Sequence, residues 1–125
     1  MSEPSPARAA QAKEAGALHV LNPIHENVPD FCRKLGDGRG VHAVFDCAGV
    51  QAAFDAALPS VRGKGIIVNV ANFEKPLVIN TPNLITRRQI NIVGSNIYTG
   101  GEFQDVIDAI ALGKVHPLQS DDNDH

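Results

Sequence analysis

The chain has 125 residues, a length that suits one domain, and its 43% hydrophobic content is ordinary for a globular protein. A net charge of -3, with basic residues scattered along the sequence, argues against a nucleic-acid partner. The chain has no apolar run near the ~20 residues of a membrane span and no signal-peptide core. Its two cysteines, Cys32 and Cys47, are too few for a disulfide framework. We therefore expect a cytoplasmic protein with reduced thiols and no membrane partner.

The first third of the chain predicts two helices around a short strand. Ser2 or Ser5 can cap a helix over residues 6–14, which Gly16 would end. Residues 19–23 read as a short strand that stops at its proline. A second helix is expected over residues 28–35, where apolar side chains recur at helical spacing.

Strands and helices then alternate along the chain. Residues 41–47 form an apolar run that predicts a strand buried on both faces. A helix is expected over residues 51–58, closed by Pro59, and a turn over residues 62–65. The remaining predicted elements are strands at 65–70 and 90–95 and an amphipathic helix at 102–112.

This alternation predicts an α/β fold with a mainly parallel sheet. One domain is expected over residues 1–117, and the acidic tail 118–125 is expected to be disordered.

Several short strings, in this order and spacing, resemble the zinc-type medium-chain alcohol dehydrogenases. They are similar above all to the butanediol, sorbitol and threonine dehydrogenase branch. The strings are SEPSPAR from Ser2, AKEAGA from Ala12, VFDCAG from Val44, GKGIIVNVA from Gly63, IVGS from Ile92 and DVIDAI from Asp105. The resemblance implies a Rossmann-type, NAD-binding domain of an enzyme that oxidises a secondary alcohol or diol. It also implies that only the later part of that domain is present, without the first strand.

The resemblance implies cofactor contacts at five places. Glu3 would accept hydrogen bonds from the adenosine ribose and repel a 2'-phosphate, which favours NAD over NADP. Arg8 would lie beside the adenosine, unless it is simply a solvated charge on the helix. The remaining contacts would come from the loop of Cys47, Ala48 and Gly49, from the strand end of Val68, Asn69 and Val70, and from Ser95 and Asn96.

The sequence also departs from the family pattern. It contains no G-x-G-x-x-G, so the pyrophosphate would lack its glycine turn. Residues 36–40 are glycine-rich, but they join a predicted helix to a strand, which is the reverse of the order that a phosphate loop needs. The two cysteines are not spaced as zinc ligands. We therefore assign no catalytic and no metal-binding residue, and we expect no dehydrogenase activity from this chain alone.

Two other interpretations stay open. The chain could be a non-catalytic module that binds a nucleotide or pairs with another subunit, as family members do, through residues 90–95. It could also be a truncated gene product begun at an internal methionine.

The strand order of a Rossmann-type domain is 3-2-1-4-5-6, with the strand at 19–23 as its third strand and the strand at 41–47 as its fourth. Because the first strand is missing, a gap is expected beside the strand at 41–47. Either the strand at 19–23 pairs directly with it, or the region before Gly40 is loosely attached. The segment from Val41 to Leu112 should keep a contiguous three-stranded sheet.

Overall fold

The computed structural model describes residues 1–95, and these divide into two compact units, Met1–Glu26 and Asn27 onward. The predicted contact at Asn96, the helix at 102–112 and the tail at 118–125 lie outside the described residues. Within residues 1–95, no helix is long and apolar enough to cross a membrane.

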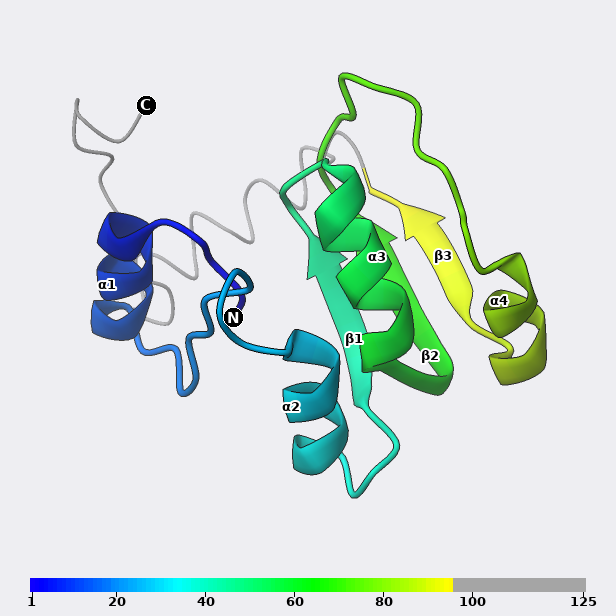
Figure 1. Cartoon of the computed structure of the whole chain (residues 1–125), viewed down its shortest axis with the longest axis horizontal. Helices are drawn as coiled ribbons and strands as arrows, with labels where there is room; N and C mark the ends of the chain where they lie inside the picture. The colour runs from blue at the N-terminus through cyan, green and yellow to red at the C-terminus, as the bar shows by residue number, and fades with distance from the viewer. Residues whose placement is uncertain (96–125) are drawn as a thin grey trace, which may run out of the picture. The chain divides into compact units, whose positions relative to one another are not determined.

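The first unit is built on helix α1, Pro6–Glu14, which has the predicted bounds (Figure 1). Ser5 caps the helix, since its side chain accepts from the Arg8 backbone N–H. Gly16 follows the last turn at a φ of 104°, a conformation that glycine adopts without strain. The sequence therefore predicted both the N-cap and the C-terminal end of this helix.

The strand predicted at residues 19–23 is reduced to a single parallel bridge between Ser2 and Leu21. Leu21 N–H donates to the Met1 carbonyl and Glu3 N–H donates to the Leu21 carbonyl. Pairing of this segment with the strand at 41–46, one of the two expected alternatives, is not found among the described residues. Pro23 lies two residues after the bridge and has no backbone N–H to donate. This limits how far strand pairing can extend from the bridge.

The second unit carries a three-stranded parallel sheet, as expected from the sequence. Its strands are β1 (Val41–Asp46), β2 (Val61–Asn69) and β3 (Asn91–Gly94), in the order β1-β2-β3. Helix α2, Val28–Leu35, has the predicted bounds and is capped by the Asn27 side chain. Helix α3, Gln51–Ser60, connects β1 to β2 and lies across both strands (Figure 1).

Two boundaries differ from the prediction. Helix α3 continues through Pro59 to Ser60, because a proline near the last turn removes only one backbone donor. Strand β2 begins at Val61 rather than at Gly65, since the fully buried Val61 pairs with Val41. The register is then interrupted, and residues 62–65 loop out before Ile66 pairs with Ala43.

The core lies on the face of the sheet that α3 covers. Its buried members are Phe54, Ala57, Leu58, Val61, Ile67 and Ile90, with Val44, Leu77, Leu84 and Ile85 packed partly against them.

The prediction that the strand at 41–47 is buried on both faces is wrong. Phe45, on the opposite face from Val44, is 67% exposed, and Val93 in the same row of the sheet is 45% exposed. Within residues 27–95, the core forms on the α3 face alone. An apolar composition therefore did not reveal which face of the strand would be covered.

Helix α4, Pro82–Arg88, lies between β2 and β3 and was not predicted from the sequence. Its signals are a proline at the first turn and two arginines in the last. Seven residues are too few for a clear helical pattern, and the Thr81 side chain makes no capping hydrogen bond.

Candidate functional site

The carboxyl ends of the three parallel strands meet at one edge of the sheet in the second unit. Asp46, Asn69 and Gly94 end β1, β2 and β3, and each pairs with its neighbour in register. Ligands of open parallel sheets bind at this edge. The predicted residues Cys47, Ala48, Gly49, Val70 and Ser95 follow directly after these strand ends.

Asp46 holds two loops at this edge. Its side-chain Oδ1 accepts from the backbone N–H groups of Ala48 at 3.0 Å and Gly49 at 3.3 Å. Its backbone carbonyl accepts from the N–H groups of Val70 at 3.0 Å and Ala71 at 3.2 Å. The residue is only 5% exposed, and its bonds to Ala48 and Gly49 are partly buried. One residue therefore sets the position of the loop after β1 and the loop after β2.

Gly49 lets these loops approach each other closely. Its φ is 68°, and a Cβ at this position would lie 2.5 Å from the Asn72 carbonyl oxygen. Gln51, at the start of α3, adds a second tie, since its side chain exchanges hydrogen bonds of 2.7 and 2.9 Å with the Val78 backbone. The two segments are thus fixed by a close contact and by paired hydrogen bonds.

At this edge, two backbone donors are used within the protein, and two side-chain acceptors have no partner among the described residues. The N–H of Val70 donates to Asp46, and the N–H of Ser95 donates to the Asn69 carbonyl at 2.9 Å. In contrast, Asp46 Oδ2 and Asn69 Oδ1 are buried without a hydrogen-bond partner. A ligand group that donates hydrogen bonds, such as a carboxamide NH₂ or a hydroxyl, would satisfy them.

The first unit brings the predicted residues Glu3 and Arg8 together. Glu3 Oε1 and Arg8 Nη1 are 3.6 Å apart, an ion pair that is too long for a hydrogen bond. The side chain of Glu3 is 14% exposed, and its Oε1 is buried without a hydrogen-bond partner. This orphaned oxygen fits a sugar hydroxyl as donor. Arg8 also lines a cavity of about 550 Å³, together with Met1, Gln11 and four alanine and glycine residues between positions 12 and 17.

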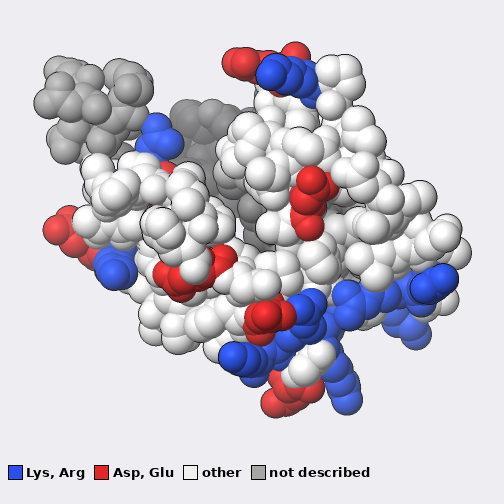
Figure 2. Space-filling view, in the orientation of Figure 1, with Lys and Arg blue, Asp and Glu red and all other residues white. Residues whose placement is uncertain are grey.

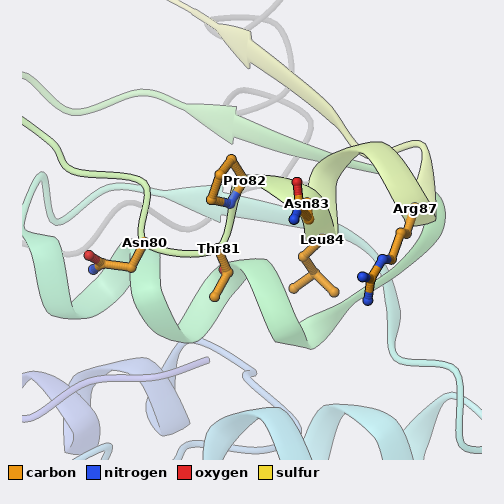
Figure 3. Close-up of a pocket in the computed structure, with 6 residues that line it drawn as sticks. All are labelled: Asn80, Thr81, Pro82, Asn83, Leu84 and Arg87. Carbon is orange, nitrogen blue, oxygen red and sulfur yellow. The ribbon is translucent and has the colours of Figure 1, made fainter.

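A second hollow, of about 370 Å³, surrounds the start of α4 and contains none of the predicted cofactor residues (Figure 3). It is lined by Asn80, Thr81, Pro82, Asn83, Leu84 and Arg87. This hollow is therefore distinct from the strand edge.

Zinc does not fit the described part of the chain. No three His, Cys, Asp or Glu side chains gather there into a group that could hold a metal ion. A catalytic zinc needs three protein ligands. Cys32 and Cys47 are free thiols.

The sequence predicts this edge, and it indicates that Asp46, an acid at a strand end, could orient a loop through a structural hydrogen bond, which the structure shows. Gln51 and Asn72 gave no sequence signal, because their roles depend on contacts with residues far along the chain.

Comparisons with known proteins agree with this architecture. The family model described as zinc-binding dehydrogenase matches residues 1–112. D-arabitol-phosphate dehydrogenase from Enterococcus avium is 28% identical over 109 residues, which are 87% of this chain and 31% of that protein. L-threonine 3-dehydrogenase from Thermococcus kodakarensis is 31% identical over 94 residues, covering 75% of this chain and 27% of that protein.

A solved structure shows the same fold. The 2R,3R-butanediol dehydrogenase from Bacillus subtilis superposes with a TM-score of 0.79 at 28% identity, over 90% of this chain and 31% of that one. The chain spans about a third of the length of these relatives. The predicted resemblance and the partial Rossmann-type α/β fold are confirmed: the chain belongs to the zinc-binding dehydrogenase family.

Proposed function

We infer that this chain supplies part of the NAD-binding domain of a zinc-type dehydrogenase that oxidises a secondary alcohol or diol. The observation that carries this proposal is the strand edge, where Asp46 fixes two loops beside the unpartnered oxygens of Asp46 and Asn69. The family match over residues 1–112 supports the reaction class. NAD, when bound, supplies the hydride acceptor.

The roles of the residues follow from their chemistry. Asn69 Oδ1 would accept from the nicotinamide carboxamide, and the loop of Cys47, Ala48 and Gly49 would border the other end of the cofactor. Glu3 would accept from the adenosine ribose, and its charge would disfavour a 2'-phosphate. Arg8 would partly neutralise Glu3, since the two groups are 3.6 Å apart. The preference for NAD is therefore expected to be moderate.

The chain alone is proposed to turn over no substrate and to bind NADH only weakly, because the pyrophosphate lacks its glycine turn. The sequence holds two cysteines without zinc-ligand spacing and no G-x-G-x-x-G. Calorimetry with NADH tests the binding, and NAD reduction with butane-2,3-diol tests the activity. Absence of NADH binding would sink the cofactor proposal, while NAD reduction by the purified chain would overturn the proposed inactivity. The free thiols and the family support a cytoplasmic site of action.

A second candidate function is subunit pairing through residues 90–95. Strand β3 ends the described sheet, and all four of its residues are exposed, with Ile92 41% and Val93 45% accessible. An unpaired apolar edge is a template for another strand. Light scattering should then show a dimer that persists at high salt and that Val93→Lys disrupts. A monomer at all salt concentrations would exclude this pairing.

A further inference from the structure

Basic side chains that are scattered in the sequence gather at the amino edge of the sheet, opposite the proposed cofactor edge. Figure 2 shows Lys and Arg forming a band over the lower edge of the second unit, near the ends of α2 and α4. We call this band the basic pole. It contains seven of the eleven basic residues of the chain: Arg33, Lys34, Arg39, Arg62, Lys64, Arg87 and Arg88.

Three arginines fix the shape of the pole. Arg33 donates to the Pro59 carbonyl, Arg62 donates twice to the Gly40 carbonyl, and Arg88 donates to the Val61 carbonyl. These bonds tie α2, the loop before β1 and α4 to the junction of α3 and β2. Helix α3 has no basic residue in its own last turn, so neighbouring elements supply the cations that favour a helix C-terminus.

Four further cations have no such structural role. Lys34, Arg39, Lys64 and Arg87 are exposed, and none of their side chains has a hydrogen bond or ion pair with another described residue.

Lys64 stands in a left-handed conformation, with a φ of 62°, in the segment that loops out of β2. A non-glycine residue held in this conformation costs free energy. The structure thus presents an exposed charge on a strained backbone.

The basic pole keeps a net positive charge, because few acidic residues lie near it. Asp30 is ion-paired with Arg33, and Asp37 is exposed in the loop before Arg39. The cations without partners outnumber these acids, although the chain as a whole carries a charge of -3.

The hollow at α4 adjoins the pole through Arg87 (Figure 3). Asn80, Thr81 and Asn83 give it side chains that both donate and accept hydrogen bonds. A peptide backbone carries both kinds of group, whereas a phosphodiester backbone carries only acceptors. Leu84 in the hollow and Leu35 on α2, which is 55% exposed, add apolar surface.

We propose that the basic pole and the adjoining hollow form a docking surface for an acidic polypeptide segment. Carboxylates of the partner meet Lys34, Arg39, Lys64 and Arg87, and its backbone or apolar side chains enter the hollow at α4. A nucleic acid fits less well, because none of the residues of the pole or the hollow is aromatic, and aromatic side chains are the main stacking platforms for bases. This surface lies away from the strand edge and does not depend on cofactor binding.

The test uses the full chain and a short fluorescein-labelled peptide of Glu-Asp-Leu repeats, with binding followed by anisotropy at low salt. The quadruple variant Lys34→Glu, Arg39→Glu, Lys64→Glu and Arg87→Glu should weaken binding by about tenfold or more, since each exposed pair is worth about two- to threefold. The control reverses Lys13 and Lys75, two exposed cations outside the pole, and should change binding by less than about twofold, whereas the matched double variant Lys34→Glu and Arg39→Glu should weaken binding about fourfold or more.

A single variant tests the hollow. Arg87→Glu should weaken peptide binding more than Lys34→Glu does, because only Arg87 lines the hollow. Circular dichroism of each variant checks that the fold is kept. The proposal is overturned if the peptide does not bind, if the quadruple variant binds it as well as wild type, or if Lys34→Glu costs as much as Arg87→Glu. A single-stranded oligonucleotide of equal charge that binds more tightly than the peptide would overturn the choice of partner.

Discussion

Removal of the Asp46 side chain tests the geometry of the proposed cofactor edge. In Asp46→Ala, the N–H groups of Ala48 and Gly49 lose their acceptor. Hydrogen bonds to a charged group contribute about 1.5–3 kcal/mol each, and the 3.3 Å bond to Gly49 belongs at the low end of that range. The free energy of unfolding should therefore fall by about 3–4.5 kcal/mol. Urea denaturation followed by circular dichroism measures this loss.

Two other variants sharpen the test. Asp46→Asn keeps an acceptor for the loop and places a donor near Asn69, so the loss should stay below about 1 kcal/mol. Glu74→Ala, at an exposed acid, should change stability by less than about 0.5 kcal/mol. Hydrogen exchange at Ala48 and Gly49 should accelerate in Asp46→Ala only. If Asp46→Ala is as stable as wild type, or if exchange at these amides is unchanged, the side chain does not hold the loop.

Three further predictions address the core, the close approach and the cofactor preference. Ile67 is 1% exposed, so Ile67→Ala should lower the free energy of unfolding by about 2–5 kcal/mol in urea denaturation. Ile92 is 41% exposed, so Ile92→Ala should lower it by less than about 1.5 kcal/mol. Equal losses in the two variants would contradict the assigned core. Gly49→Ala should lower the free energy of unfolding, measured by urea denaturation, more than Gly38→Ala does. Both glycines have positive φ, but of the two only Gly49 has a backbone atom within 3 Å of the added Cβ. An equal loss in the two variants would exclude the close contact as the cause. Glu3→Gln should lower the Kd for NADPH relative to NADH by about fivefold in calorimetry, and an unchanged ratio would remove Glu3 from the ribose site.

The sequence determined the local elements for reasons that lie within a few residues. A serine before a proline set the start of α1, and α2 has the predicted bounds because an asparagine caps it and a glycine follows it. Apolar runs located all three strands of the sheet, and the order of short strings identified the family. Caps, helical spacing and motif order depend on neighbouring residues, so they can be recognised in the sequence without knowledge of the fold.

The tertiary structure decided what depends on residues far apart in the chain. It left Phe45 exposed, because α3 covers only the other face of the sheet. It extended β2 to Val61 through pairing with β1, and it made Asp46 a tie between two loops. It also brought seven scattered cations to one edge, because helices that connect parallel strands end where the next strand begins. Burial and charge clustering are properties of packed surfaces, and a linear pattern does not specify which surfaces meet.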